Sequence, residues 1–121
     1  MNSNAQRLRD YLTHIVAAIE RIDHYTDDMD ETAFMRSPIV QDAVIRNFEI
    51  IGEASSSVLR RHPDFAADHP EVPLAAAYQM RNALAHGYFK VDLEIVWKTI
   101  SSDLPRLHAV LCSVLATLDQ P

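Results

Sequence analysis

The fold is decided by the stretch DLEIVWKTISSDLPRLHAVLCSVLATL, residues 92–118, in which large apolar residues recur alternately four and three positions apart. An α-helix turns once in about 3.6 residues, so this spacing puts the apolar side chains in one stripe. Asp92 is a favourable N-cap residue, and Pro105 interrupts the backbone hydrogen bonds, which predicts a kink near it. The stripe consists of Leu93, Trp97, Ile100, Leu104, Leu107, Leu111, Val114 and Leu118. Such regular alternation is typical of helices that pack in a bundle.

The same apolar spacing predicts further helices in the first half of the chain. A first helix spans residues 4–24, and a short helical turn spans residues 32–36. A long helix over residues 38–61 starts with a proline, which suits the first helical position, and Ser37 is expected to cap it. This helix is expected to end before Pro63, because proline cannot continue a helix.

A loop and one more helix complete the predicted fold. Residues 62–72 contain two prolines with acidic residues between them and are predicted to form a loop. A helix then runs over residues 73–86, where Gly87 can adopt the left-handed conformation that ends helices. We therefore expect an all-α protein, an antiparallel bundle of four to five helices, formed by residues 1–121 as a single domain.

Composition and charge narrow the classes of function. The chain has 121 residues, 48% of them hydrophobic, and a net charge of −6, so a broad nucleic-acid-coating surface is not expected and any such contact should be confined to a local cleft. The single cysteine, Cys112, lies in an apolar run and is expected to be a packed thiol. No segment resembles a signal peptide or a membrane span, which makes the cytoplasm the expected location. The histidines lack the spacing of paired metal ligands, so neither a metal nor another cofactor is expected.

The segment RNALAHGY, residues 81–88, carries the chemistry of this sequence. RNA can be cleaved by its own 2′-hydroxyl if an enzyme moves protons and stabilises charge on the phosphoryl oxygens. His86 can act as a general acid or base, and Arg81 offers a fork of donors to phosphate oxygens. Asn82 can orient the histidine or the substrate, and Tyr88 can donate to phosphate or stack on a base. These residue types suit a metal-independent ribonuclease.

Two interpretations of the motif remain open from the residues alone. Arg81 and His86 lie roughly 140° apart around an ideal helix, which weakens an active site built from one chain. Two copies at a dimer interface would bring two such half-sites into one cleft. The alternative is structural: Arg81 would pair with an acid, and His86 would cap the end of its helix.

The sequence resembles the HEPN superfamily, and within it the HepT-like toxins of HepT/MntA (HEPN/minimal nucleotidyltransferase) toxin–antitoxin modules. The motif at residues 81–88 matches that family's pattern of Arg, four spacers, His, one spacer and Tyr. The stretch QDAVIRNFEIIGEA, residues 41–54, resembles its third-helix signature. Residues 91–97 and 103–105 are similar to its last-helix pattern. The resemblance covers nearly the whole chain.

This resemblance implies a HEPN-like helical dimer that cleaves RNA without a metal, with Arg81 and His86 as the catalytic pair and Asn82 and Tyr88 in support. It implies the role of a toxin in a type VII-like toxin–antitoxin system. The partner would be a minimal nucleotidyltransferase antitoxin that AMPylates Tyr88. The alternative function is a non-catalytic helical interaction module that binds a nucleotide or protein partner through the same cleft.

Several residues of the third helix have simpler expected roles. Asn47 interrupts the apolar stripe and is expected to be a buried, hydrogen-bonded residue rather than a residue of the cleft. Gly52 costs helix stability, so close approach of another helix is the expected reason for it. Arg46, Glu49 and Glu53 share one face, which is expected to be a salt-bridged face in solvent or at a dimer contact.

Overall fold

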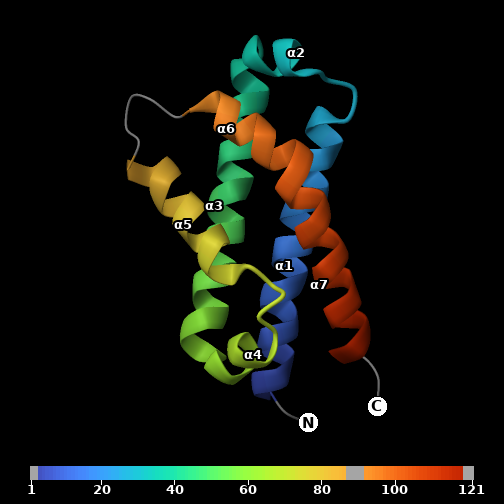
Figure 1. Ribbon diagram of the computed structural model, residues 1–121, viewed down its shortest axis with the longest axis vertical. Helices are drawn as coiled ribbons and strands as arrows, with labels where there is room; N and C mark the ends of the chain where they lie inside the picture. Colours follow the sequence, from blue (N-terminus) through green and yellow to red (C-terminus); the bar gives the residue numbers. More distant parts are fainter. Residues whose placement is uncertain (1–2, 87–91, 119–121) are drawn as a thin grey trace.

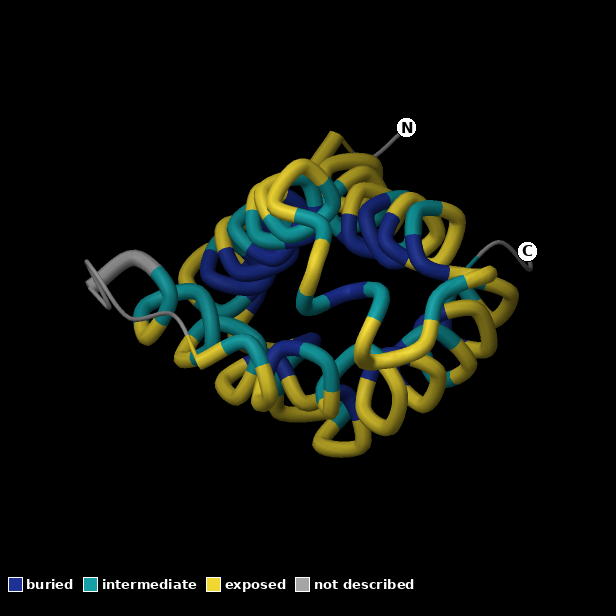
Figure 2. The backbone as a smooth tube through the Cα atoms, turned by 90° about the horizontal axis from the view of Figure 1, so that it is seen from above, coloured by how far each residue is buried: buried dark blue, intermediate teal, exposed yellow. Residues whose placement is uncertain are grey.

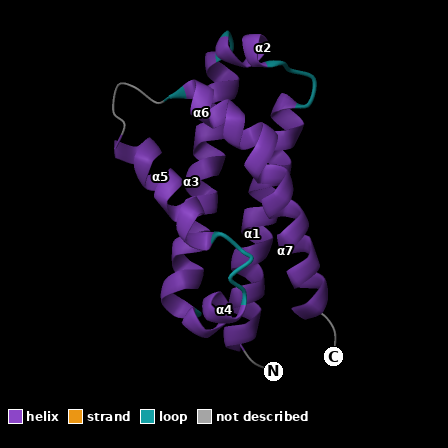
Figure 3. Cartoon of the chain, viewed as in Figure 1, coloured by secondary structure: helices purple, strands orange, loops and turns teal. Residues whose placement is uncertain are grey.

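The computed structural model describes residues 3–86 and 92–118, apart from the side chains of Ala85 and His86. Every regular element in these ranges is helical, which confirms the all-α prediction (Figure 3). The elements are α1 (Ser3–Thr26), α2 (Glu31–Met35), α3 (Pro38–Arg61), α4 (Pro63–Asp68), α5 (Leu74–His86), α6 (Leu93–Lys98), the π-helical turn η1 (Thr99–Asp103) and α7 (Leu104–Leu118). No helix of the described ranges is long and apolar enough to cross a membrane.

The long helices form an antiparallel bundle (Figure 1). Helix α3 packs against both α1 and α5, and α7 packs against α1 on the other side. Figure 2, which looks along the bundle, shows the buried residues turned toward its interior. The core is made of the predicted stripes, with Leu12, Ile15, Ile22, Val44, Ile51, Val58 and Leu111 each at most 2% exposed. The prediction that these stripes bury one another is confirmed.

Asn47 is buried in α3 and hydrogen-bonded, as predicted. Only 4% of the residue is exposed. Its side-chain oxygen accepts a hydrogen bond from Arg21 Nε at 2.7 Å, and its amide nitrogen donates to the carbonyl of Ala43 at 2.9 Å. A polar group inside the bundle is stable because both ends of it are paired.

The predicted loop over residues 62–72 is wrong in its first half, which forms α4. Pro63 does end α3, but it also occupies the first turn of the new helix, where its missing N–H costs nothing. Phe65 anchors this short helix in the core with 8% exposure. His62, expected in the loop, is 7% exposed and lies edge-on to the ring of Tyr11.

The two predicted N-caps have different outcomes. Asp92 caps α6, because its carboxylate accepts hydrogen bonds from the backbone N–H groups of Glu94 and Ile95. Ser37 occupies the N-cap position of α3, but its side chain makes no capping hydrogen bond. Helix α3 starts instead on the backbone geometry of Pro38, which is already restricted to a helical φ.

The disturbance predicted near Pro105 is the π-helical turn η1, immediately before it. The N–H of Leu104 donates to the carbonyl of Thr99, five residues back. This wider turn accommodates a proline that has no N–H to donate and whose ring would crowd the preceding turn. Figure 1 shows the chain changing direction between α6 and α7 at this point.

Cys112 is exposed, so the prediction of a packed thiol is wrong. It follows Leu111 directly, and Leu111 is fully buried in the stripe of α7. One residue corresponds to about 100° of helix rotation, which turns the thiol away from the core.

Candidate functional site

Gly52 determines how closely α5 approaches α3. A Cβ atom added at Gly52 would lie 2.1 Å from Cβ and 2.6 Å from Cγ of Arg81, and 3.4 Å from the carbonyl oxygen of Ala77. Side chains larger than hydrogen are therefore excluded at this position by the motif arginine itself. The prediction that Gly52 permits close approach of another helix is confirmed, and the group that approaches is Arg81.

The guanidinium of Arg81 is held from two directions. Nη2 lies 2.6 Å from Oε1 of Glu53, and Nη1 donates to Oδ1 of Asn82 at 3.0 Å. The Arg81 side chain is 31% exposed and that of Glu53 is 59% exposed, so the pair lies at the surface of the α3–α5 contact. The fork is thus fixed in orientation, yet one side of it still reaches solvent.

Arg81 keeps donor capacity beyond these two contacts. A guanidinium has five N–H groups. Its Nε is buried and has no hydrogen-bond partner among the described residues, so the N–H groups that a ligand can reach are those left on Nη1 and Nη2. A charged group held in place with unused donors is suited to bind an anion that approaches along its open edge.

His86 and Tyr88 complete the predicted set only in part. His86 is the last residue of α5, as the sequence predicts. Its side chain lies outside the described residues, and so do Gly87 and Tyr88. The structure therefore brings together Arg81 and Asn82 of the predicted site residues.

A groove of the described surface, called here the α5–α7 groove, is separate from Arg81. It has a volume of about 730 Å³ and lies between α5 and the α6–η1–α7 segment, over α3. Its lining is mainly apolar and includes Ile51, Met80 and Leu107. Arg81 and Asn82 do not line this groove. A single chain thus presents Arg81 on the flank of the α3–α5 pair and not inside this groove.

The sequence model of the family described as "Ribonuclease HepT-like" matches residues 15–114. This range includes the glycine of α3 and the whole of α5. The chain belongs to the HepT-like ribonuclease family. No solved structure matches it.

Curated relatives of this HepT-like chain carry ribonuclease names. It is 42% identical over 99 residues to "Probable ribonuclease HepT" of Thermococcus cleftensis, covering 82% of this chain and 87% of the relative. It is 32% identical over 107 residues to a "Putative RNase" of Caldanaerobacter subterraneus, covering 88% and 93%. It is 37% identical over 110 residues to a "Gamma-glutamylcyclotransferase and putative RNase" of Methanocaldococcus jannaschii. The aligned region is 91% of this chain but only 48% of that longer relative.

Glu53 is the residue of this HepT-like site that the sequence interpretation missed. It was grouped with Arg46 and Glu49, and those two do form an ion pair at 3.6 Å with exposed side chains. The carboxylate of Glu53 instead contacts Arg81 on another helix. Its position directly after Gly52 could have indicated this contact, because a side chain that packs against Gly52 also lies close to residue 53.

Charge near the α5–α7 groove comes partly from Glu71, which lines it. A hydrogen bond with His69, 3.0 Å away, lowers the pKa of the Glu71 carboxyl below its ordinary value of 4.5. Among the residues that the structure describes, no three His, Cys, Asp or Glu side chains are grouped as a metal site would require.

Proposed function

We propose that this HepT-like chain is an endoribonuclease that uses the 2′-hydroxyl of its RNA substrate as the nucleophile. The observation that carries the proposal is the guanidinium of Arg81, held in place by Glu53 and Asn82 while its side chain stays 31% exposed. Family membership and the ribonuclease names of the relatives support the same function.

In the proposed reaction, the 2′-oxygen attacks the adjacent phosphorus and the bond to the 5′-oxygen of the next nucleotide breaks. His86 moves protons, taking one from the 2′-hydroxyl or giving one to the leaving oxygen. Arg81 stabilises the negative charge that builds on the phosphoryl oxygens. The products are a 2′,3′-cyclic phosphate and a 5′-hydroxyl, and no metal ion is required for either proton transfer.

Glu53 is proposed as a positioning residue that acts through Arg81. Its carboxylate orients the guanidinium, but it also neutralises part of the charge that a phosphate would meet. Glu53→Gln keeps a hydrogen-bond acceptor and removes the negative charge. We expect this variant to bind RNA more tightly, with a lower KM, while kcat falls because the fork is held less firmly.

The active form is proposed to be a homodimer. One chain carries a single motif histidine, and Arg81 stands on the flank of the α3–α5 pair, where a second copy could face it. Two motifs facing each other would provide separate acid and base histidines in one cleft. If a variant that is monomeric in solution retains full cleavage activity, the shared cleft is wrong.

The chain is further proposed to act in the cytoplasm as the toxin of a type VII-like toxin–antitoxin system. Its antitoxin would be a minimal nucleotidyltransferase that transfers AMP to Tyr88. An adenylyl group on the motif tyrosine would add bulk and negative charge to a motif that is meant to bind phosphate, which would repel the RNA backbone. Intact-mass measurement after incubation with that enzyme and ATP should show AMP added at Tyr88, and addition at another residue would contradict this step.

The central test is cleavage of RNA by the purified chain in the presence of EDTA. We expect cleavage by the wild type and a loss of at least about a hundredfold in rate for His86→Ala. His24→Ala is the matched control, because His24 is an exposed histidine of α1, and it should cleave at the wild-type rate. Wild-type activity in His86→Ala would refute the assignment. RNA or nucleotide binding without cleavage would favour the alternative function, a non-catalytic interaction module.

A further inference from the structure

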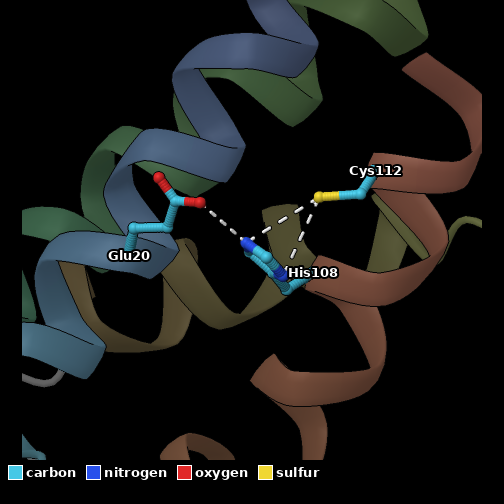
Figure 4. A network of polar contacts seen from close by, with 3 residues as sticks. All are labelled: Glu20, His108 and Cys112. Atoms are coloured by element: carbon cyan, nitrogen blue, oxygen red, sulfur yellow. Dashed lines mark hydrogen bonds and ion pairs between the residues drawn. The ribbon is translucent and has the colours of Figure 1, made fainter. Parts of the chain in front are cut away.

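A second chemical cluster lies between α1 and α7, outside the proposed ribonuclease site. Figure 4 shows Glu20 of α1 and both His108 and Cys112 of α7 directed toward one another. His108 Nε2 lies 2.9 Å from Oε2 of Glu20. The sulfur of Cys112 lies 3.8 Å from both ring nitrogens of the same histidine.

The packing of α7 against α1 creates this cluster. His108 and Cys112 are four residues apart and therefore lie one above the other on the helix. Each follows a buried leucine of the core stripe, Leu107 or Leu111, so both lie on the flank of the stripe. The thiol is exposed, whereas the His108 side chain is 34% exposed and partly enclosed.

The three groups have the roles of a nucleophile, a base and an orienting acid. With its Nε2 hydrogen directed at the carboxylate of Glu20, a neutral imidazole has an unprotonated Nδ1. The sulfur of Cys112 lies 3.8 Å from that nitrogen, within the distance of a hydrogen bond to sulfur, so a small rotation of the thiol lets Nδ1 accept its proton. The carboxylate also stabilises the imidazolium that results. A base within reach of a thiol can take its proton during reaction, and the thiolate is the reactive form of cysteine.

A groove of about 390 Å³ adjoins the cluster on the side of Glu20 and His108, while Cys112 lies outside its lining. Glu20 and His108 line it together with Asp23 and apolar residues of α1, η1 and α7. Two carboxylates at its edge, in a chain of net charge −6, favour a cationic or neutral molecule over an anionic one.

We propose that Cys112 is a modification site that reacts with cationic or neutral low-molecular-weight disulfides. His108 accepts the thiol proton, and the thiolate sulfur attacks one sulfur of the disulfide. The disulfide bond of the co-reactant breaks, and a new one forms between Cys112 and one half of it. The other half leaves as a thiolate and takes the proton from His108. Cys112 is oxidised, and the departing half is reduced.

The test uses the whole chain, in which Cys112 is the single cysteine, so every mixed disulfide reports on this residue. The rate of mass gain with cystamine, a dicationic disulfide, is measured near neutral pH by intact-mass spectrometry. We expect His108→Gln to slow the reaction at least about tenfold and Glu20→Gln at least about threefold. His14→Gln, which removes an exposed histidine of α1 outside the cluster, should react at the wild-type rate.

Glutathione disulfide, which is anionic, provides the second arm of the test. At low salt it should react at least about threefold more slowly than cystamine, relative to the rates of each with a free thiol, and added salt should reduce the difference. Circular dichroism confirms that each variant is folded. Unchanged reaction rates in His108→Gln would overturn the proposed base. Equal or faster reaction with glutathione disulfide would overturn the proposed class of co-reactant.

Discussion

Replacing Gly52 with alanine should destabilise the protein, although alanine is normally the better helix residue. The exchange gains about 1 kcal/mol of helix propensity. The new Cβ would lie 2.1 Å from Cβ of Arg81, whereas ordinary contact begins at 3.4 Å, so α5 would have to retreat by about 1.3 Å. Cβ is fixed to the backbone and cannot rotate away. Overpacking of a well-packed site costs about 1–3 kcal/mol, and here we expect the upper part of that range, for a net loss of about 1–2 kcal/mol.

Urea denaturation followed by circular dichroism measures this loss. With an m-value of about 2 kcal/mol per molar, the middle of the usual range, the midpoint for Gly52→Ala should fall by about 0.5–1 M urea. Arg81→Gly removes the opposing Cβ, so in that background Gly52→Ala should be neutral or stabilising. Arg81→Ala retains the Cβ and should leave the penalty in place. If Gly52→Ala alone is as stable as the wild type, the argument for steric contact between Gly52 and Arg81 is refuted.

Three further predictions concern polar groups. Asp92→Ala should lower the free energy of unfolding by about 1 kcal/mol because α6 loses its N-cap, whereas Asp92→Asn should retain most of it; equal midpoints in urea for the alanine variant and the wild type would contradict this. Asn47→Ala should lower the free energy of unfolding by about 1–3 kcal/mol, because it leaves Arg21 Nε without its acceptor and opens a small cavity. Arg21→Ala should lower it by less, and the reverse order would be inconsistent with the buried hydrogen bond. His69→Ala should raise the pKa of Glu71 toward 4.5 in an NMR titration. Because the pKa of Glu71 is lowered in the folded protein, its contribution to stability is present above pH 4.5 and is lost as the pH falls through the folded pKa. An unchanged titration curve of Glu71 in His69→Ala would refute the assignment of the lowered pKa to His69.

Sequence periodicity was sufficient for the long helices and insufficient for the short one. Helices α3 and α5 begin beside Pro38 and Pro73 as predicted, because proline restricts the backbone locally and leaves a mark in the sequence. Helix α4 has six residues and buries Phe65, so it is too short to show an apolar repeat in the sequence. Its proline was interpreted only as a terminator of α3, although the same residue also starts a helix.

The candidate site divides in the same way. Arg81 and its neighbour Asn82 could be chosen from the sequence because their chemistry and spacing are local properties. The ion pair with Glu53 could not be predicted, since it joins residues of two helices and depends on how each helix is rotated about its axis. Close approach of another helix at Gly52 was predicted, but Arg81 as the residue that makes the contact was not.

The sequence by itself determined the helical class, the core stripes and the candidate motif residues, because each of these follows from residue type and short-range spacing. The family came from the resemblance of the sequence to known proteins. Only the tertiary structure decided which side chains meet across helices. Arg81 is paired and held at the surface of α3, and Glu20 lies beside His108 from a position 88 residues away. Such contacts depend on the packing of whole helices against one another, and the local 3.6-residue repeat contains no information about them.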